Sequence, residues 1–223
     1  MNSKIKFVTP VALLDVIKNI APGFEQDTGH RLELSIMLNP EVPAFINGGA
    51  KWSLAASNPW HLEEIPANER GPIHAIGRSP LAFGALSDGG THVCDEAQIS
   101  DVLRRSKRIG VTDAGTSGGT FGQLLDRLKM KDEVQDRIIP LKGGEPMRQL
   151  LAGQLDLAVL PLTNIAPIRG VGSIAVCPWD FDVHIDLALC CHPKASADAQ
   201  MFADWLMSND RDETLEVLGL TRT

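Results

Sequence analysis

Small hydroxyl and glycine residues are concentrated at positions 115–120, where the sequence reads GTSGGT. A short apolar run at 109–112 precedes them, and apolar residues follow at helical spacing through Leu128. This order predicts a strand, a turn and the start of a helix. The first turn of a helix presents backbone N–H groups and the positive end of the helix dipole, so it suits an anion. The candidate contacts are Thr116, Ser117 and Gly118. The alternative is that a hydroxyl of Thr116 or Ser117 only caps the helix.

Other predicted strands also end in residues that suit either a ligand or a turn. They are Thr9 after strand 5–8, Asn39 after strand 31–36, Ser57 after strand 52–56, and Pro161 and Thr163 after strand 157–160. Hydroxyl and amide side chains at these places can donate hydrogen bonds to an anion. The alternative is ordinary turn and cap chemistry, for which Asn-Pro and Ser-Asn-Pro are common sequences.

Three ionisable residues are candidates for charge chemistry. Arg78 precedes a predicted strand. It is either a contact for a ligand carboxylate or an ordinary exposed arginine. Glu145 opens a predicted helix, where it is either a proton-transfer base, since burial raises a carboxyl pKa, or a stabiliser of its own helix. His74 is a candidate acid or base, with a solvated histidine as the alternative.

Composition narrows the classes of partner. The chain has 223 residues and a formal net charge of −7, and its basic residues form no extended run. This argues against nucleic-acid binding. No stretch is long and apolar enough to insert into a membrane. The four cysteines lack C-x-x-C spacing and no histidines are spaced as metal ligands, so the sequence predicts neither a metal nor a cofactor.

The beginning of the sequence bears on localisation. The first predicted strand, 5–8, starts almost at Met1 and leaves no room for a signal peptide. As written, the chain is therefore expected in the cytoplasm. If Met1 replaces a removed leader, the expected compartment is the periplasm.

Strands and helices alternate along the chain. The predicted strands are 5–8, 31–36, 52–56, 81–85, 109–112, 138–141, 157–160 and 184–191, and the predicted helices are 12–24, 99–105, one that starts in 116–120 and runs through 128, one ending at 151, 199–207 and 212–218. Pro10 suits the first position of the first helix. The alternation predicts an α/β protein with mainly parallel sheets flanked by helices. Ligands of such proteins bind beyond the carboxyl ends of the strands.

Four segments carry a resemblance to a known family. They are IAPGFEQDTGH at 20–30, GAKWSLAAS at 49–57, GQLDLAV at 153–159, and the tail at 203–220. Their order and spacing resemble the periplasmic molybdate-binding protein family, which has the type II periplasmic-binding fold. The resemblance implies two lobes, one formed by 1–79 and 192–223 and the other by 80–191, with the ligand in a cleft between them. It also implies a membrane transporter as partner if the protein is exported.

A divergent branch of that family is similar over two glycine-rich segments. They are GTSGGTF at 115–121, followed by leucines and DEV at 132–134, and GGEPM at 143–147. Some members of this branch resemble aconitate isomerases, which move a proton along an unsaturated tricarboxylate. Others are described only as substrate-binding proteins.

The chain departs from the molybdate-binding pattern at three places. Thr9-Pro10 stands where the family has a serine, Asn39-Pro40 where it has a second serine, and Pro161 where it has a late tyrosine. Lost hydroxyl donors disfavour molybdate or tungstate, whereas a carboxylate pairs well with arginine and helix N-termini. The sequence therefore predicts binding of a small organic anion, a di- or tricarboxylate. The alternative function is a cofactor-independent isomerase of an unsaturated carboxylate such as aconitate.

Overall fold

The computed structural model describes residues 4–87 and 89–222, which form two compact units. Unit 1 contains the described residues up to Arg78, then Asp186–Val217 and the residues from Thr221 onward. Unit 2 contains Ser79–Ile185 and Leu218–Leu220, with residue 88 outside the description. Strands β4 (Ile73–Leu86) and β9 (His184–Cys191) each run from one unit into the other. The sequence analysis expected the boundaries between the two lobes at 79/80 and at 191/192.

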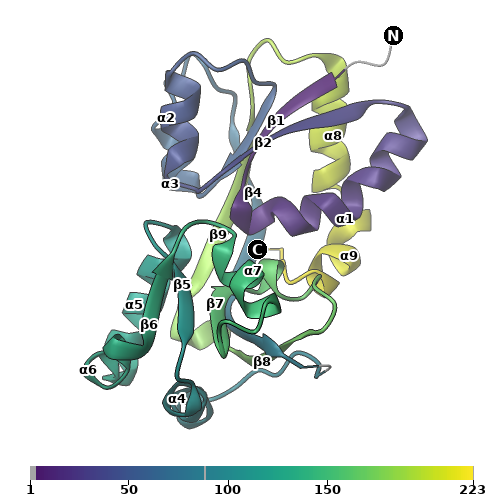
Figure 1. The fold of residues 1–223 in the computed structure, drawn as a ribbon. Helices are drawn as coiled ribbons and strands as arrows, with labels where there is room; N and C mark the ends of the chain where they lie inside the picture. The colour runs from purple at the N-terminus through teal and green to yellow at the C-terminus, as the bar shows by residue number, and fades with distance from the viewer. Residues whose placement is uncertain (1–3, 88, 223) are drawn as a thin grey trace. The chain divides into compact units, whose positions relative to one another are not determined.

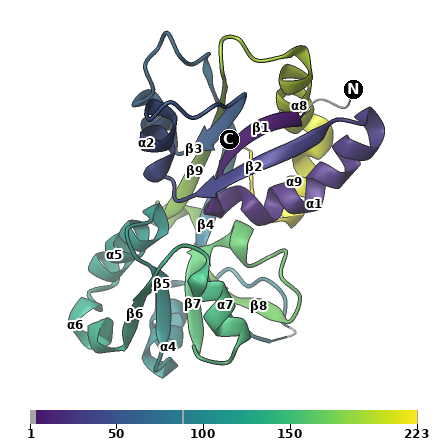
Figure 2. The same cartoon turned by 45° about the horizontal axis from the view of Figure 1, so that its top comes forward.

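Unit 1 is built on a mixed sheet with the strand order β2 (Arg31–Met37), β1 (Lys4–Pro10), β3 (Leu54–Ser57) and β9. Strands β2, β1 and β3 are parallel, and β9 runs antiparallel to β3. The helices are α1 (Val11–Thr28), α2 (Glu41–Asn47), α3 (Pro59–Glu63), α8 (Ala197–Met207) and α9 (Asp212–Val217) (Figure 1). Figure 2 shows α1 and α8 on one face of this sheet and α2 on the other.

Aromatic packing holds α1 and α8 on their face of the unit 1 sheet. Phe24 of α1 meets Phe202 of α8 at a ring-centroid distance of 5.0 Å, and Phe202 meets Phe7 of β1 at 5.8 Å. All three side chains are fully buried. On the opposite face a second apolar cluster joins Val42 of α2 and Leu62 of α3 to the strands. Each face of the unit 1 sheet therefore has its own hydrophobic core, and the two cores together hold the strands in place.

Unit 2 has a second mixed sheet, in the order β8 (Val171–Val176), β4, β7 (Leu157–Pro161), β5 (Ile109–Thr112) and β6 (Ile138–Leu141). Strands β7, β5 and β6 are parallel, whereas β4 is antiparallel to both β7 and β8. The helices are α4 (Glu96–Arg105), α5 (Thr116–Leu128), α6 (Lys131–Val134) and α7 (Glu145–Leu151). Four short 3₁₀ turns, residues 135–137, 162–164, 179–181 and 209–211, complete the described secondary structure of the two units.

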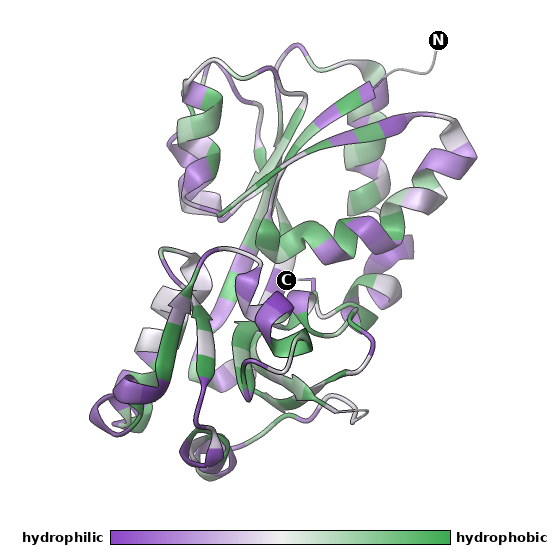
Figure 3. Cartoon of the chain, viewed as in Figure 1, coloured by the Kyte–Doolittle hydropathy of each residue, from purple (hydrophilic) through white to green (hydrophobic). Residues whose placement is uncertain are grey.

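The two faces of the unit 2 sheet are both covered. Ile99 of α4 and Phe121 of α5 pack with Phe83 in one buried cluster, and Leu150 of α7 packs with Leu160 in another. Figure 3 shows the corresponding pattern, with hydrophobic residues concentrated in the strands and hydrophilic ones on helix surfaces. Among the described residues, none of the helices has both the length and the apolar character needed to cross a membrane.

The α/β class and the predicted helices and strands are confirmed, with three kinds of difference. The sheets are mixed rather than mainly parallel, because β4, β8 and β9 run against their neighbours. Pro10 ends β1 and precedes α1, with a backbone ψ of 154°, so it is not the first helical residue. Helices α2, α3 and α6 and strand β8 were not predicted. The three helices have four to seven residues each, and α2 and α3 contain proline. In β8, Gly172 and Ser173 break the apolar sequence pattern.

Candidate functional site

Unit 1 brings three predicted site residues to one edge of its sheet. In the parallel register Thr9 pairs with Ile36, and Val8 pairs with Ala55, so β1, β2 and β3 end at the same level. Thr9, Asn39 and Ser57 all lie at this carboxyl edge and are buried. The Ser57 hydroxyl lies 3.0 Å from the backbone oxygen of Asn39 and 3.1 Å from its side-chain oxygen, so it donates to that residue.

Thr9 differs from its neighbours in how its hydroxyl is used. The side chain is fully buried, yet Oγ1 has no hydrogen-bond partner among residues 4–87 and 89–222. A buried polar group without a partner costs about 1–3 kcal/mol relative to a satisfied one. Such a group is uncommon enough to require an explanation, and a ligand is one. Thr9 is therefore the best-supported candidate contact in unit 1.

Arg78 and His74 lie on the unit 1 part of β4. Arg78 Nε donates to Asp186 Oδ1 at 2.7 Å, and the backbone oxygen of Asp186 accepts from the side-chain amide of Asn58 at 2.6 Å. The Arg78 side chain remains 46% exposed, so the rest of its guanidinium is accessible. His74 is exposed, and the structure gives it no hydrogen bond or ion pair with Thr9, Asn39 or Ser57. It is not brought into this cluster.

In unit 2 the helix α5 begins as the sequence predicts, but its cap is different. The N-cap residue is Gly115, in an extended conformation, which has no side chain to cap the helix. Thr116, Ser117 and Gly118 are its first three residues. The interpretation of Thr116 or Ser117 as a side-chain cap is therefore wrong. The Thr120 hydroxyl donates to the backbone oxygen of Thr116 at 3.0 Å, so it serves the helix itself.

Gly118 has a steric role that the structure makes explicit. A Cβ atom at this position would lie 2.3 Å from the backbone oxygen of Thr112, which ends β5. Only glycine allows the first turn of α5 to pack this closely on the strand. At Gly119, by contrast, a Cβ would meet nothing within 4 Å. Packing against β5 therefore requires glycine at position 118 but not at position 119.

The other unit 2 candidates also follow parallel strands. Thr163 is fully buried after β7, and its backbone N–H donates to the Ser79 hydroxyl at 3.1 Å. Pro161 is the last residue of β7 and has no N–H, so it offers an anion no hydrogen bond. Glu145 is the first residue of α7, which follows β6. Because β7, β5 and β6 are parallel, their carboxyl ends place these residues and the start of α5 at one edge of unit 2.

Glu145 is held in an ion pair rather than in an apolar pocket. Its carboxylate accepts from Arg148 at 2.8 Å across one helical turn, and the two side chains are 35% and 69% exposed. Glu145 lies in unit 2 and His74 in unit 1. The described residues contain no group of three or more histidine, cysteine, aspartate or glutamate side chains placed to hold a metal ion.

Four polar residues near these edges were missed by the sequence analysis. Asn58, Ser79 and Asn164 are buried, and Asp186 pairs with Arg78. Asn58 and Asn164 follow predicted strand ends, which is the same signal that selected Ser57 and Thr163. Ser79 and Asp186 carry no local signal, since their positions depend on which strands become neighbours.

A model of the family described as bacterial extracellular solute-binding protein matches residues 5–221. The chain belongs to this family. A search of curated protein sequences finds no significant match.

Solved structures with the same fold include three anion-binding relatives of this solute-binding protein. The periplasmic molybdate-binding protein of Azotobacter vinelandii is 19% identical, with a TM-score of 0.83 and coverage of 98% of this chain and 99% of the other. The L-phospholactate-bound structure of PEB3, a protein of Campylobacter jejuni, is 13% identical with a TM-score of 0.71, and the match covers 98% of this chain and 100% of PEB3. A phosphate ABC transporter substrate-binding protein of Clostridium perfringens with bound phosphate is 10% identical, with a TM-score of 0.68 over 99% and 100%.

At these identities the likeness shows the fold. The predicted two-lobed solute-binding-protein fold is confirmed. The positions of the anion contacts stay predictions.

Proposed function

We propose that this solute-binding protein binds a small organic anion that carries carboxylate groups. In unit 1 the proposed contacts are Thr9, Asn39 and Ser57. In unit 2 they are the first residues of α5, Thr116, Ser117 and Gly118. The observation that carries the proposal is the fully buried Thr9 hydroxyl, which has no hydrogen-bond partner in the described part of the chain. A ligand oxygen that accepts from Thr9 would remove the cost of this unsatisfied group.

The start of α5 supports an anion as the ligand. The helix has 13 residues, its first turn contains no acidic residue, and its N-cap is a glycine. The aligned peptide dipoles favour negative charge there by about 0.3–1 kcal/mol. Ser117 is buried in the same turn and adds a hydroxyl group. At Gly119 a Cβ would meet nothing within 4 Å, so this glycine leaves space beside the helix.

Two features of the chain favour a carboxylate over molybdate as the ligand. The sequence contains no tyrosine, and the serine positions of molybdate-binding proteins hold Thr9 and Asn39. The accessible part of the Arg78 guanidinium suits a planar carboxylate, which accepts two parallel hydrogen bonds from arginine. The relatives bind molybdate, phosphate and L-phospholactate, and the last of these carries a carboxylate beside its phosphoryl group.

A thermal-shift and calorimetric screen tests this proposal. Citrate, cis-aconitate, phosphate and molybdate are compared at equal concentration. A carboxylate present at 100 times its dissociation constant should add about 2.7 kcal/mol to the free energy of unfolding. Replacing both Thr116 and Ser117 with alanine should weaken binding, whereas Thr91→Ala, at an exposed hydroxyl of the same unit, should not. Stabilisation by molybdate without any by the carboxylates would refute the carboxylate proposal.

An isomerase acting on aconitate is the second candidate. It is favoured by the glycine-rich segments 115–121 and 143–147, which resemble the branch that includes aconitate isomerases. Incubation with cis- or trans-aconitate, followed by NMR, would reveal interconversion. Absence of turnover, with binding retained, would leave the binding role alone.

We further propose that the protein acts outside the cytoplasm and delivers its anion to a membrane transporter. The family description, an extracellular solute-binding protein, supports this compartment. Cell fractionation of the producing organism would test it, and recovery of the protein only in the cytoplasm would refute it.

A further inference from the structure

Two cysteines of unit 2 lie side by side on neighbouring extended segments. Val93 and Val176 form a parallel β-bridge, and the backbone N–H of Cys94 donates to the Val176 oxygen at 3.0 Å. Cys94 and Cys177 are each the next residue along, so they occupy the following register position. Side chains at paired positions project to the same face. Both thiols are buried in the same apolar cluster, 8% and 2% exposed.

A register position on neighbouring extended segments is compatible with the Cα separation that a disulfide needs. Neighbouring strands are separated by about 4.7–4.9 Å, and disulfides join Cα atoms about 4.4–6.8 Å apart. The electrostatics agree with the close approach. Burial raises the pKa of the Cys177 thiol to about 12, and the neighbouring Cys94 adds to this rise.

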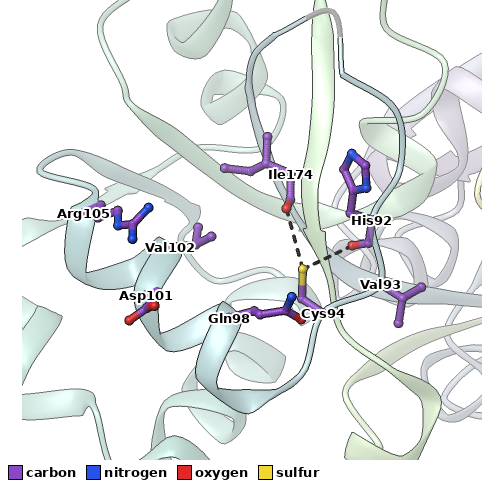
Figure 4. A pocket seen from close by; sticks show the side chains of 8 residues that line it. All are labelled: His92, Val93, Cys94, Gln98, Asp101, Val102, Arg105 and Ile174. Carbon is purple, nitrogen blue, oxygen red and sulfur yellow. Dashed lines mark hydrogen bonds between the residues drawn. The ribbon is translucent and has the colours of Figure 1, made fainter.

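Cys94 is the member of the pair that borders a pocket. It lines a pocket of about 420 Å³ in unit 2, shown in Figure 4. The Cys94 thiol donates to the backbone oxygens of His92 at 3.6 Å and Ile174 at 3.8 Å. Figure 4 marks both hydrogen bonds with dashed lines. Gln98, Val102 and Arg105 of α4 also line this pocket. Cys177 does not line it.

We propose that Cys94 and Cys177 are a redox pair that forms a disulfide by exchange with a small disulfide compound. The Cys94 thiolate attacks one sulfur of the compound, whose S–S bond breaks and releases a first thiol. The Cys177 thiolate then attacks the Cys94 sulfur of the mixed disulfide and releases the second thiol. The two protons lost by the protein are carried by the two released thiols. The product ties the residues before α4 to the end of β8.

The remaining cysteines provide an internal comparison. Cys190 and Cys191 are adjacent on β9, so their side chains project to opposite faces of the strand and cannot pair without breaking it. Cys190 is fully buried and Cys191 is partly exposed. Accessibility alone therefore predicts reaction at Cys191, whereas the proposal predicts a cross-link between Cys94 and Cys177.

Peptide mapping of the intact chain tests the proposal directly. The protein is incubated with oxidised glutathione at mildly alkaline pH, remaining thiols are alkylated, and the digest is analysed by mass spectrometry. The expected result is a linked peptide pair containing Cys94 and Cys177, a mass loss of two hydrogens, and an unfolding midpoint several degrees higher. Cys94→Ser or Cys177→Ser should each abolish the link, whereas the double variant Cys190→Ser, Cys191→Ser should retain it. A glutathione adduct on Cys94 that never resolves, or modification of Cys191 alone, would overturn the proposal.

Discussion

Replacing Thr9 with valine tests the candidate site most directly. The substitution exchanges the hydroxyl for a methyl group of similar size and keeps the branched side chain of β1. In the free protein the hydroxyl is fully buried and unpartnered within the described residues. Removing an unsatisfied buried group relieves a desolvation cost of about 1–3 kcal/mol. We expect the free energy of unfolding of the ligand-free protein to stay constant or to rise by about 1 kcal/mol, which raises Tm by about 2–4 °C.

The same substitution should weaken anion binding. A hydrogen bond from a hydroxyl to a charged group contributes about 1.5–3 kcal/mol. Because 1.4 kcal/mol corresponds to a tenfold change in Kd, we expect Thr9→Val to raise Kd by about 10- to 100-fold. Isothermal titration calorimetry gives Kd, and urea denaturation without ligand gives the free energy of unfolding. The combination of retained stability and lost affinity is what distinguishes a ligand contact from a structural residue.

Thr120→Val is the matched control. Thr120 is also buried, but its hydroxyl donates to the backbone oxygen of Thr116 at 3.0 Å. Its removal should lower the free energy of unfolding by about 1 kcal/mol. If Thr9→Val lowered stability as much as Thr120→Val and left Kd unchanged, Thr9 would be a structural residue, and the argument from its unpartnered hydroxyl would be refuted.

Two further predictions concern unit 2. Gly118→Ala should lower the free energy of unfolding by about 1–3 kcal/mol, because the new Cβ would overlap the Thr112 oxygen. Gly119→Ala should raise the free energy of unfolding by up to about 1 kcal/mol, because alanine has the higher helix propensity. Equal effects of the two substitutions in urea denaturation would contradict the packing argument. The Asp156 carboxylate accepts hydrogen bonds from the side chain and the backbone N–H of Arg108. The bond from the Arg108 side chain is the main cause that holds the pKa of Asp156 below its ordinary value of 3.8. The stabilisation that the ionised Asp156 gives the folded state is present above pH 3.8 and is lost as the pH falls through the lowered pKa. Asp156→Asn should therefore lower the free energy of unfolding at pH 7. In strong acid the difference from the unsubstituted protein should disappear.

The fold could be predicted from sequence where periodicity is long or a strand is bounded by clear turn residues. Helix α5 and strand β5 follow from the apolar spacing around 115–120. Helices α2 and α3 are too short for a helical period to be read, and both contain proline. The direction of β8 and β9 depends on which strands they meet, and no residue within either strand encodes it.

The candidate site could be predicted in part because strand ends are local features. Thr9, Asn39 and Ser57 were selected one by one for their positions after strands, and the parallel register places them at one edge. The role of each hydroxyl could not be predicted. Ser57 donates to Asn39, Thr120 to the backbone of its own helix, and Thr9 to nothing in the described structure. These differences depend on oxygen atoms supplied by other segments.

The glycine-rich segment at 115–120 shows how the structure changes such an interpretation. From sequence, a hydroxyl cap and an anion site were competing explanations of Thr116 and Ser117. The N-cap is Gly115, which removes the first explanation, and Gly118 is required for α5 to begin against the end of β5. A helix whose first turn is left without a side-chain cap keeps its positive end for another negative group. The stability that a capping serine or threonine would contribute, about 0.5–2 kcal/mol, is then absent from the free protein and can be restored by a bound anion.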